Sequence, residues 1–340
     1  MPLLLITILA HRGYVLQFLS DYNMNSRMLI AVPVLLLGQQ FMESRFRLIL
    51  NHIYDARLLS DAGMAHMDEI LASLVRWRDS AIPELLILLL LAIHTFTSYK
   101  TIASDTPWFA YGSGPDVHLT LAGWYAVIVT ATIFQFLLGF SLWKWLLWTI
   151  FAFQLSRLKL RLVPSHPDEN GGLGFLALSP QAFGPIAFAA TIVIGAAFRH
   201  EILHRGAHLV DFRMPAALLV VIIFVVALGP LSFFVPSLAA SRRKGILEYA
   251  LVGTMQSSAF HEKWVLHRTE HEDEVLAAPE ISTLCDYNSA FKNVEALKPF
   301  PIDKNTLIGL AISIALPALP TVVAEIPLTE LLKQLFGALK

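Results

Sequence analysis

The sequence predicts an all-α, polytopic helical membrane protein, and three observations carry this prediction. The chain of 340 residues is 56% hydrophobic and only 15% charged, whereas soluble domains carry roughly 25% charged residues. Its mean hydropathy is +0.60. The apolar residues come in uninterrupted runs of about 20, the length that an α-helix needs to cross a bilayer. We therefore expect five to seven hydrophobic segments and a helical lobe on the cytoplasmic side.

The apolar runs give the expected spans in chain order. Four runs are long enough to cross, at residues 83–99, 119–142, 172–198 and 215–235. A fifth run, at 27–42, is shorter. The sixth, at 306–323, contains Pro317 and Pro320. Because proline removes a hydrogen bond from a helix interior, this run is expected either to be a kinked span or to re-enter the membrane inside the protein.

The polar stretches divide the chain into four predicted regions. Residues 1–25 form a partial helix and a polar linker, consistent with a truncated first span. Residues 26–238 form the membrane domain, including an amphipathic segment at 43–82. Residues 239–305 form a helical lobe, and residues 306–340 combine the proline-broken segment with an amphipathic C-terminal helix.

Lys and Arg predict the orientation. They gather in segments 43–82, 157–161 and 242–244, which fall on one side of the membrane if each run crosses once. Segment 199–213, with three arginines, falls on the other side. Since basic short loops stay in the cytoplasm, the three-segment side is predicted to be cytoplasmic, and the expected location is the bacterial inner membrane.

Composition excludes several functions. A net charge of −1 provides no field for nucleic acid. The single cysteine, Cys285, excludes a disulfide within the chain and a cysteine-based zinc cluster. Charged residues are nearly absent from the centres of the runs, which argues against a proton-driven pump. A passive pore, a scaffold or a lipid-facing enzyme remains.

A polar, glycine-rich loop between two apolar runs is the first candidate site. It reads VPSHPDENGGLGFL from Val163 to Leu176. Its prolines stop the preceding helix, an acidic or amide side chain can cap the next one, and its glycines permit a tight turn. We expect this loop to be a hinge or a pore mouth at the cytoplasmic face. The candidate residues are His166, Asp168, Glu169, Asn170, Gly171 and Gly172.

The segment RHEILHRGAHLVDF contains a possible metal site. His200, Glu201 and His204 match the short pattern H-E-x-x-H, in which two imidazoles one helical turn apart bind zinc and the glutamate acts as the base. His208 lies about 12 Å further along the axis than His200, too far to share one ion. The structural alternative is an ordinary helix end, and a divalent metal is the only cofactor that we consider.

The chain also resembles a family of uncharacterised bacterial multi-pass membrane proteins. The resemblance rests on LRLVPSHPDENGGLGFL, ILHRGAHLVDF, GILEYA and the block PFPIDKNTLIGLAISIALPALPTVVAEIPLTELLKQLFG, and it covers residue 119 to the C-terminus. It implies a multi-pass membrane fold and carries over no activity or site residue. His200 and His208 depart from the family pattern, which weakens the metal hypothesis.

These observations favour a homo-oligomeric channel or passive transport protein, with the bilayer as its main partner. Short, proline-interrupted segments often mark ion paths, so Pro317 and Pro320 join the candidate residues. The alternatives are a membrane metalloenzyme that uses His200, Glu201 and His204, and a scaffold subunit without catalytic activity.

Overall fold

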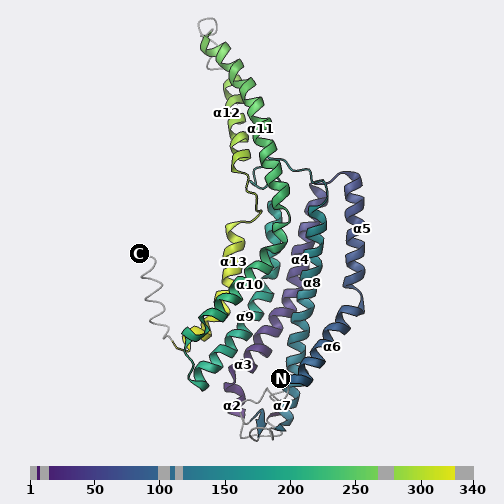
Figure 1. Cartoon of the computed structure of the whole chain (residues 1–340), viewed down its shortest axis with the longest axis vertical. Helices are drawn as coiled ribbons and strands as arrows, with labels where there is room; N and C mark the ends of the chain where they lie inside the picture. Colours follow the sequence, from purple (N-terminus) through teal and green to yellow (C-terminus); the bar gives the residue numbers. More distant parts are fainter. Residues whose placement is uncertain (1–5, 8–14, 99–107, 112–117, 267–278, 326–340) are drawn as a thin grey trace.

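The computed structural model describes residues 6–7, 15–98, 108–111, 118–266 and 279–325. Long helices run side by side in a bundle, and a helical hairpin projects from one end of it (Figure 1). This architecture confirms the predicted all-α membrane fold. One pair of two-residue strands, β1 (Ala110–Tyr111) and β2 (His118–Leu119), is the only β-structure in the described part of the chain.

The main helices, in chain order, are α4 (Val32–Asp55), α5 (Asp61–Arg78), α6 (Ala81–Ser98), α8 (Thr132–Ser156), α9 (Leu178–Arg205), α10 (Arg213–Ser232), α11 (Val235–Phe260), α12 (Pro279–Ala296) and α13 (Lys304–Val323). The shorter helices are α2 (Val15–Ser20), α3 (Tyr22–Ser26) and α7 (Leu121–Tyr125). The π-helical turns Arg27–Ala31, Ala126–Ala131 and His261–Leu266 adjoin α4, α8 and α11. Two 3₁₀ turns, Gly174–Ala177 and Leu209–Phe212, precede α9 and α10.

Four helical stretches are long and apolar enough to cross a membrane. They are Leu121–Ser156, Gly174–Arg205, Leu209–Ser232 and Lys304–Val323, and Ala81–Thr95 is a shorter apolar helix. In α6 and α10 the leucines, isoleucines and valines are largely exposed. A bilayer is the solvent that such faces require.

Helix α9 is the centre of the bundle and packs against α13, α4, α10 and α8. Small residues allow the close approaches, as is usual for helices in membranes. A Cβ on Gly38 of α4 would stand 2.4 Å from the Cβ of Pro185, and one on Gly195 would stand 2.8 Å from the Thr321 hydroxyl. At these two positions α9 therefore lies so close to α4 and to α13 that a side chain larger than hydrogen would not fit.

Helix α13 is continuous through both prolines. It runs for 20 residues from Lys304 to Val323 and begins at Asp303, whose side chain accepts the N–H of Thr306. At 1.5 Å per residue this is about 30 Å, the thickness of the hydrocarbon core. The predicted proline-broken segment is therefore one continuous helix that is long enough to span a membrane.

One end of the bundle collects the basic segments that the sequence places on one side. We call it the basic end: the ends of α4 and α8, all of α5, the loop from Val163 to Leu176, and the hairpin of α11 and α12 (Figure 1). Most of region 1–25 and the predicted C-terminal helix at 326–340 lie outside the described residues.

Candidate functional site at the basic end

Asp168 organises the polar loop that the sequence singled out. Its Oδ1 accepts the N–H groups of Asn170 at 2.8 Å and Gly172 at 3.1 Å, and its Oδ2 accepts the N–H of Gly174 at 2.8 Å. The Nδ1 of His166 lies 2.8 Å from Oδ1. One carboxylate thus satisfies three backbone donors where the chain turns into α9, which extends the capping role that the sequence predicts for it.

These hydrogen bonds set the charge state of Asp168. Burial alone would raise the pKa of this carboxyl. The hydrogen bonds from Asn170, Gly174 and Gly172, together with His166, outweigh burial and hold the pKa below its ordinary value. Asp168 is therefore an ionised structural anchor at neutral pH. Its occupied oxygens leave it poorly suited to act as a base or a metal ligand.

The backbone of the loop explains its glycines. Gly171 has φ 62° and Gly172 φ 92°, and the preceding Glu169 also takes a positive φ of 54°. Glycine adopts such angles without steric cost, whereas a glutamate does not. Asn170 between them is only 7% exposed, and its Oδ1 has no hydrogen-bond partner among the described residues.

The same loop fastens the projecting hairpin to the membrane bundle. The N–H of Lys298, which follows α12, donates to the Glu169 carbonyl at 2.7 Å, and the Lys298 ammonium lies 2.5 Å from the Glu169 carboxylate. The hydroxyls of Ser165 and Tyr249 on α11 are 2.7 Å apart. A Cβ on Gly245 of α11 would meet the Cβ of Pro164 at 2.6 Å. The predicted loop residues therefore lie together at the junction between the membrane bundle and the hairpin. Their role as a pore mouth stays a prediction.

Among the described residues, the possible metal site at the other end of α9 brings two histidines together. The rings of His200 and His204 stack with their centroids 4.5 Å apart. Glu201 pairs with Arg205 at 3.0 Å, and His208 pairs with Glu325 at 3.2 Å. Within the described residues, no group of three His, Cys, Asp or Glu could hold a metal ion. Of the three residues in the H-E-x-x-H pattern, the structure brings His200 and His204 into contact, while Glu201 pairs with Arg205.

Pro317 and Pro320 do not meet the polar loop. Pro317 is buried where α13 packs on α9. One turn further along α13, the Thr321 hydroxyl donates to the Gly195 carbonyl of α9 at 2.8 Å. At the other end of α13, the Thr306 hydroxyl donates to the Ala177 carbonyl at 2.9 Å. The two threonines anchor the helix to α9 above and below its prolines.

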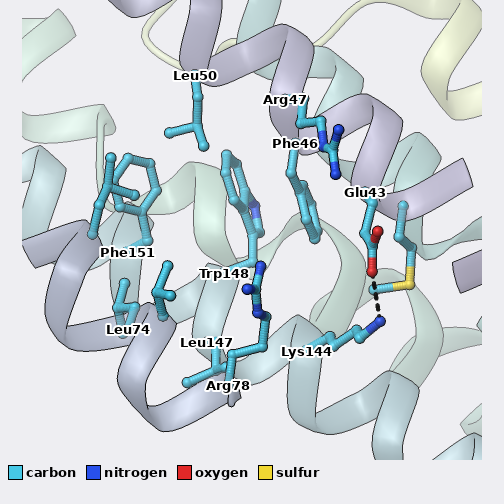
Figure 2. Close-up of a pocket in the computed structure, with 13 residues that line it drawn as sticks. Glu43, Phe46, Arg47, Leu50, Leu74, Arg78, Lys144, Leu147, Trp148 and Phe151 are labelled. Atoms are coloured by element: carbon cyan, nitrogen blue, oxygen red, sulfur yellow. Dashed lines mark hydrogen bonds and ion pairs between the residues drawn. The ribbon is translucent and has the colours of Figure 1, made fainter. Parts of the chain in front are cut away.

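A pocket between α4, α5 and α8 was not predicted from the sequence (Figure 2). Its volume is about 170 Å³, and the Lys144 ammonium lies 2.8 Å from the Glu43 carboxylate beside it. The lining residues are Met42, Glu43, Phe46, Arg47, Leu50, Leu71, Leu74, Val75, Arg78, Lys144, Leu147, Trp148 and Phe151. The feature of the sequence that could have indicated this pocket is Lys144, a lone lysine in the 36-residue apolar stretch Leu121–Ser156.

The fold and these sites define the chain as a helical membrane protein with a large polar end. Comparison with protein-family models, with curated proteins and with solved structures finds no match. The function must therefore be inferred from the geometry of this chain alone.

Proposed function

We propose that the protein is a self-associating membrane scaffold whose copies pack through the hairpin of α11 and α12. The observation that carries this proposal is an apolar stripe on α11. Leu247, Leu251 and Met255 are 69%, 69% and 73% exposed, and they follow one another at four-residue spacing. Residues at that spacing share one helix face.

Lipid does not cover this stripe. Helix α11 begins at Val235, directly after the span that ends at Ser232, and it continues away from the bundle (Figure 1). From Val235 to Leu247 the helix rises about 18 Å at 1.5 Å per residue. The headgroup layer is only about 5–8 Å deep on each side of the hydrocarbon core. The stripe therefore faces water unless a protein covers it, and exposed apolar patches of this kind mark interaction sites.

A second copy of the chain is the occupant that the flanking charges favour. Lys244 and Glu248 border the stripe and carry opposite charges 3.5 Å apart. In a two-fold contact the same surface meets itself, so a lysine of one copy can pair with a glutamate of the other. The junction at Glu169 and Lys298 fixes the hairpin to the bundle, so association of hairpins also brings the membrane helices together.

A passive path between copies is the second candidate function. A groove of about 480 Å³ between α4, α9 and α13 is lined by Gln181, Asn305 and Ser313, among apolar residues. Gln181 donates to the Thr306 hydroxyl and Ser313 to the Gly309 carbonyl, and the remaining hydrogen-bonding capacity of these side chains can face another copy or a water-filled path. This groove supports the channel hypothesis, and the bacterial inner membrane remains the proposed location.

The test is the oligomeric state of a triple variant, Leu247→Ser, Leu251→Ser and Met255→Ser, by mass photometry in detergent. The proposal expects the wild type to be oligomeric and the variant to be monomeric with unchanged helix content. Asp286→Ala, on the exposed face of α12, is the matched control and keeps the oligomer. A monomeric wild type would refute the proposal. Ion flux through proteoliposomes that contain the wild-type oligomer then tests the second candidate function.

A further inference from the structure

The pocket between α4, α5 and α8 lies at the level where the chain changes from apolar to polar. Below it, α6 presents exposed leucines such as Leu85 and Leu89. At its level, the rings of Trp77 and Trp143 meet edge to face at 6.4 Å. Tryptophan favours the headgroup region of a bilayer. The pocket therefore opens where phospholipid headgroups are found.

The lining of the pocket is amphipathic. Trp148 stands at its centre and stacks on Phe46 with ring centroids 4.4 Å apart, while Leu50, Leu74 and Phe151 complete an apolar floor (Figure 2). Arg47 of α4 and Arg78 of α5 stand at the rim. An apolar floor beneath a cationic rim matches a ligand with a hydrocarbon part and an anionic part.

The charges at the rim do not cancel. Lys144 and Glu43 neutralise each other at 2.8 Å, and Arg78 pairs with Asp79 at 2.8 Å outside the lining. Arg47 has no ion-pair partner within the described ranges, although it lowers the pKa of Glu43 through space, after the larger effect of the Lys144 hydrogen bond. A net positive charge thus remains beside the aromatic floor.

The wall of the pocket also contains a donor that the described residues leave unsatisfied. The side chain of Trp148 is nine-tenths buried, and its indole N–H has no hydrogen-bond partner among the described residues. Because neighbouring atoms shield this nitrogen from solvent, it does not locate a ligand, and the amphipathic lining and the rim charges indicate the ligand class.

We infer that this pocket binds an anionic phospholipid, with its phosphate at Arg47 and Arg78 and the first part of an acyl chain against Phe46, Trp148 and Phe151. Arg47 suits phosphate because its planar guanidinium can donate two parallel hydrogen bonds. Arg78 gives its Nε and Nη2 donors to Asp79 and keeps Nη1 for the ligand. A volume of about 170 Å³ accommodates a headgroup or a short chain segment, while the rest of the lipid stays in the bilayer. The site does not depend on self-association.

The test is native mass spectrometry of the purified full chain, with phosphatidylglycerol and phosphatidylcholine added in turn. The expected result is retention of phosphatidylglycerol at least tenfold above phosphatidylcholine, and a loss of at least tenfold in Arg47→Gln/Arg78→Gln. The matched control is Arg45→Gln/Arg76→Gln, which removes two arginines from the same helices outside the lining. It keeps wild-type retention.

Further measurements separate lipid binding from other causes. Leu74→Trp fills the floor without changing charge and is also expected to weaken retention, while circular dichroism confirms that each variant is folded. Equal retention of both lipids, or equal losses in the two arginine pairs, would overturn the inference. Displacement of phosphatidylglycerol by millimolar inorganic phosphate would also overturn it, because the site would then recognise the anion alone.

Discussion

The carboxylate of Asp168 accepts the N–H of Gly174 at 2.8 Å, six residues further along the chain, and so closes the polar loop onto the start of α9. The same carboxylate holds the N–H groups of Asn170 and Gly172. The neighbouring Glu169 holds Lys298 after α12. One short loop therefore links the membrane bundle to the hairpin through which copies are proposed to meet.

Removal of this carboxylate is expected to destabilise the protein strongly. Asp168→Ala leaves three backbone donors without their acceptor, and we expect a loss of about 2–4 kcal/mol in the free energy of unfolding. A simple helix cap would account for only about 0.5–2 kcal/mol. Unfolding by SDS titration in mixed micelles measures the difference. Lys298→Met is the comparison, because it removes only a half-exposed ion pair and should cost at most about 1 kcal/mol.

The junction should also depend on pH through Asp168. The folded protein holds the pKa of this carboxyl below its ordinary value, which is about 3.9 in the unfolded chain. Its contribution to stability is therefore complete above about pH 4 and is lost as the pH falls through the lower, folded value. Hydrogen–deuterium exchange measures this loss, because the exchange of the Gly172 and Gly174 amide protons should become faster as the carboxylate is protonated. Asp168→Asn should show no such step, and an identical step in that variant would assign the effect to another group.

The contact between the hairpin and the loop gives a steric prediction. A methyl group at Gly245 would lie 2.6 Å from the Cβ of Pro164, so Gly245→Ala should lower the free energy of unfolding by about 1–3 kcal/mol. Gly229 in α10 has no atom within 4 Å of the added position. Gly229→Ala should therefore be neutral or stabilise by up to about 1 kcal/mol. Thermal unfolding of both variants compares their stabilities with that of the wild type. An equal change in stability for the two variants would contradict the close packing of Gly245 against Pro164.

Much of the fold could be predicted from the sequence because helical spans depend on local composition. The runs at 119–142, 172–198, 215–235 and 306–323 each largely coincide with a helix of spanning length, whereas the run at 83–99 corresponds to the shorter apolar helix Ala81–Thr95. Asp168 was identified as a possible cap for the same reason, since capping acts over a few residues. The continuity of α13 was not decided, because proline costs depend on how the helix packs, and here Thr306 and Thr321 anchor it to α9.

The sites could be predicted only in part because they join distant parts of the chain. Glu43 and Lys144 form their ion pair across 101 positions, and Lys298 reaches Glu169 after the whole of α9, α10, α11 and α12. No periodicity in a single segment indicates such pairings. The stripe on α11 is a similar case, since four-residue spacing shows which residues share a face but not whether a neighbouring helix covers that face.

Cysteine cross-linking tests self-association through the hairpin most directly. The native Cys285 is first replaced by serine, and a single cysteine is introduced by Met255→Cys in the stripe or by Ser282→Cys on the exposed face of α12. Mild oxidation in native membranes should give a disulfide-linked dimer for Met255→Cys and little or none for Ser282→Cys. A monomer at Met255→Cys, or equal cross-linking at both positions, would contradict the account.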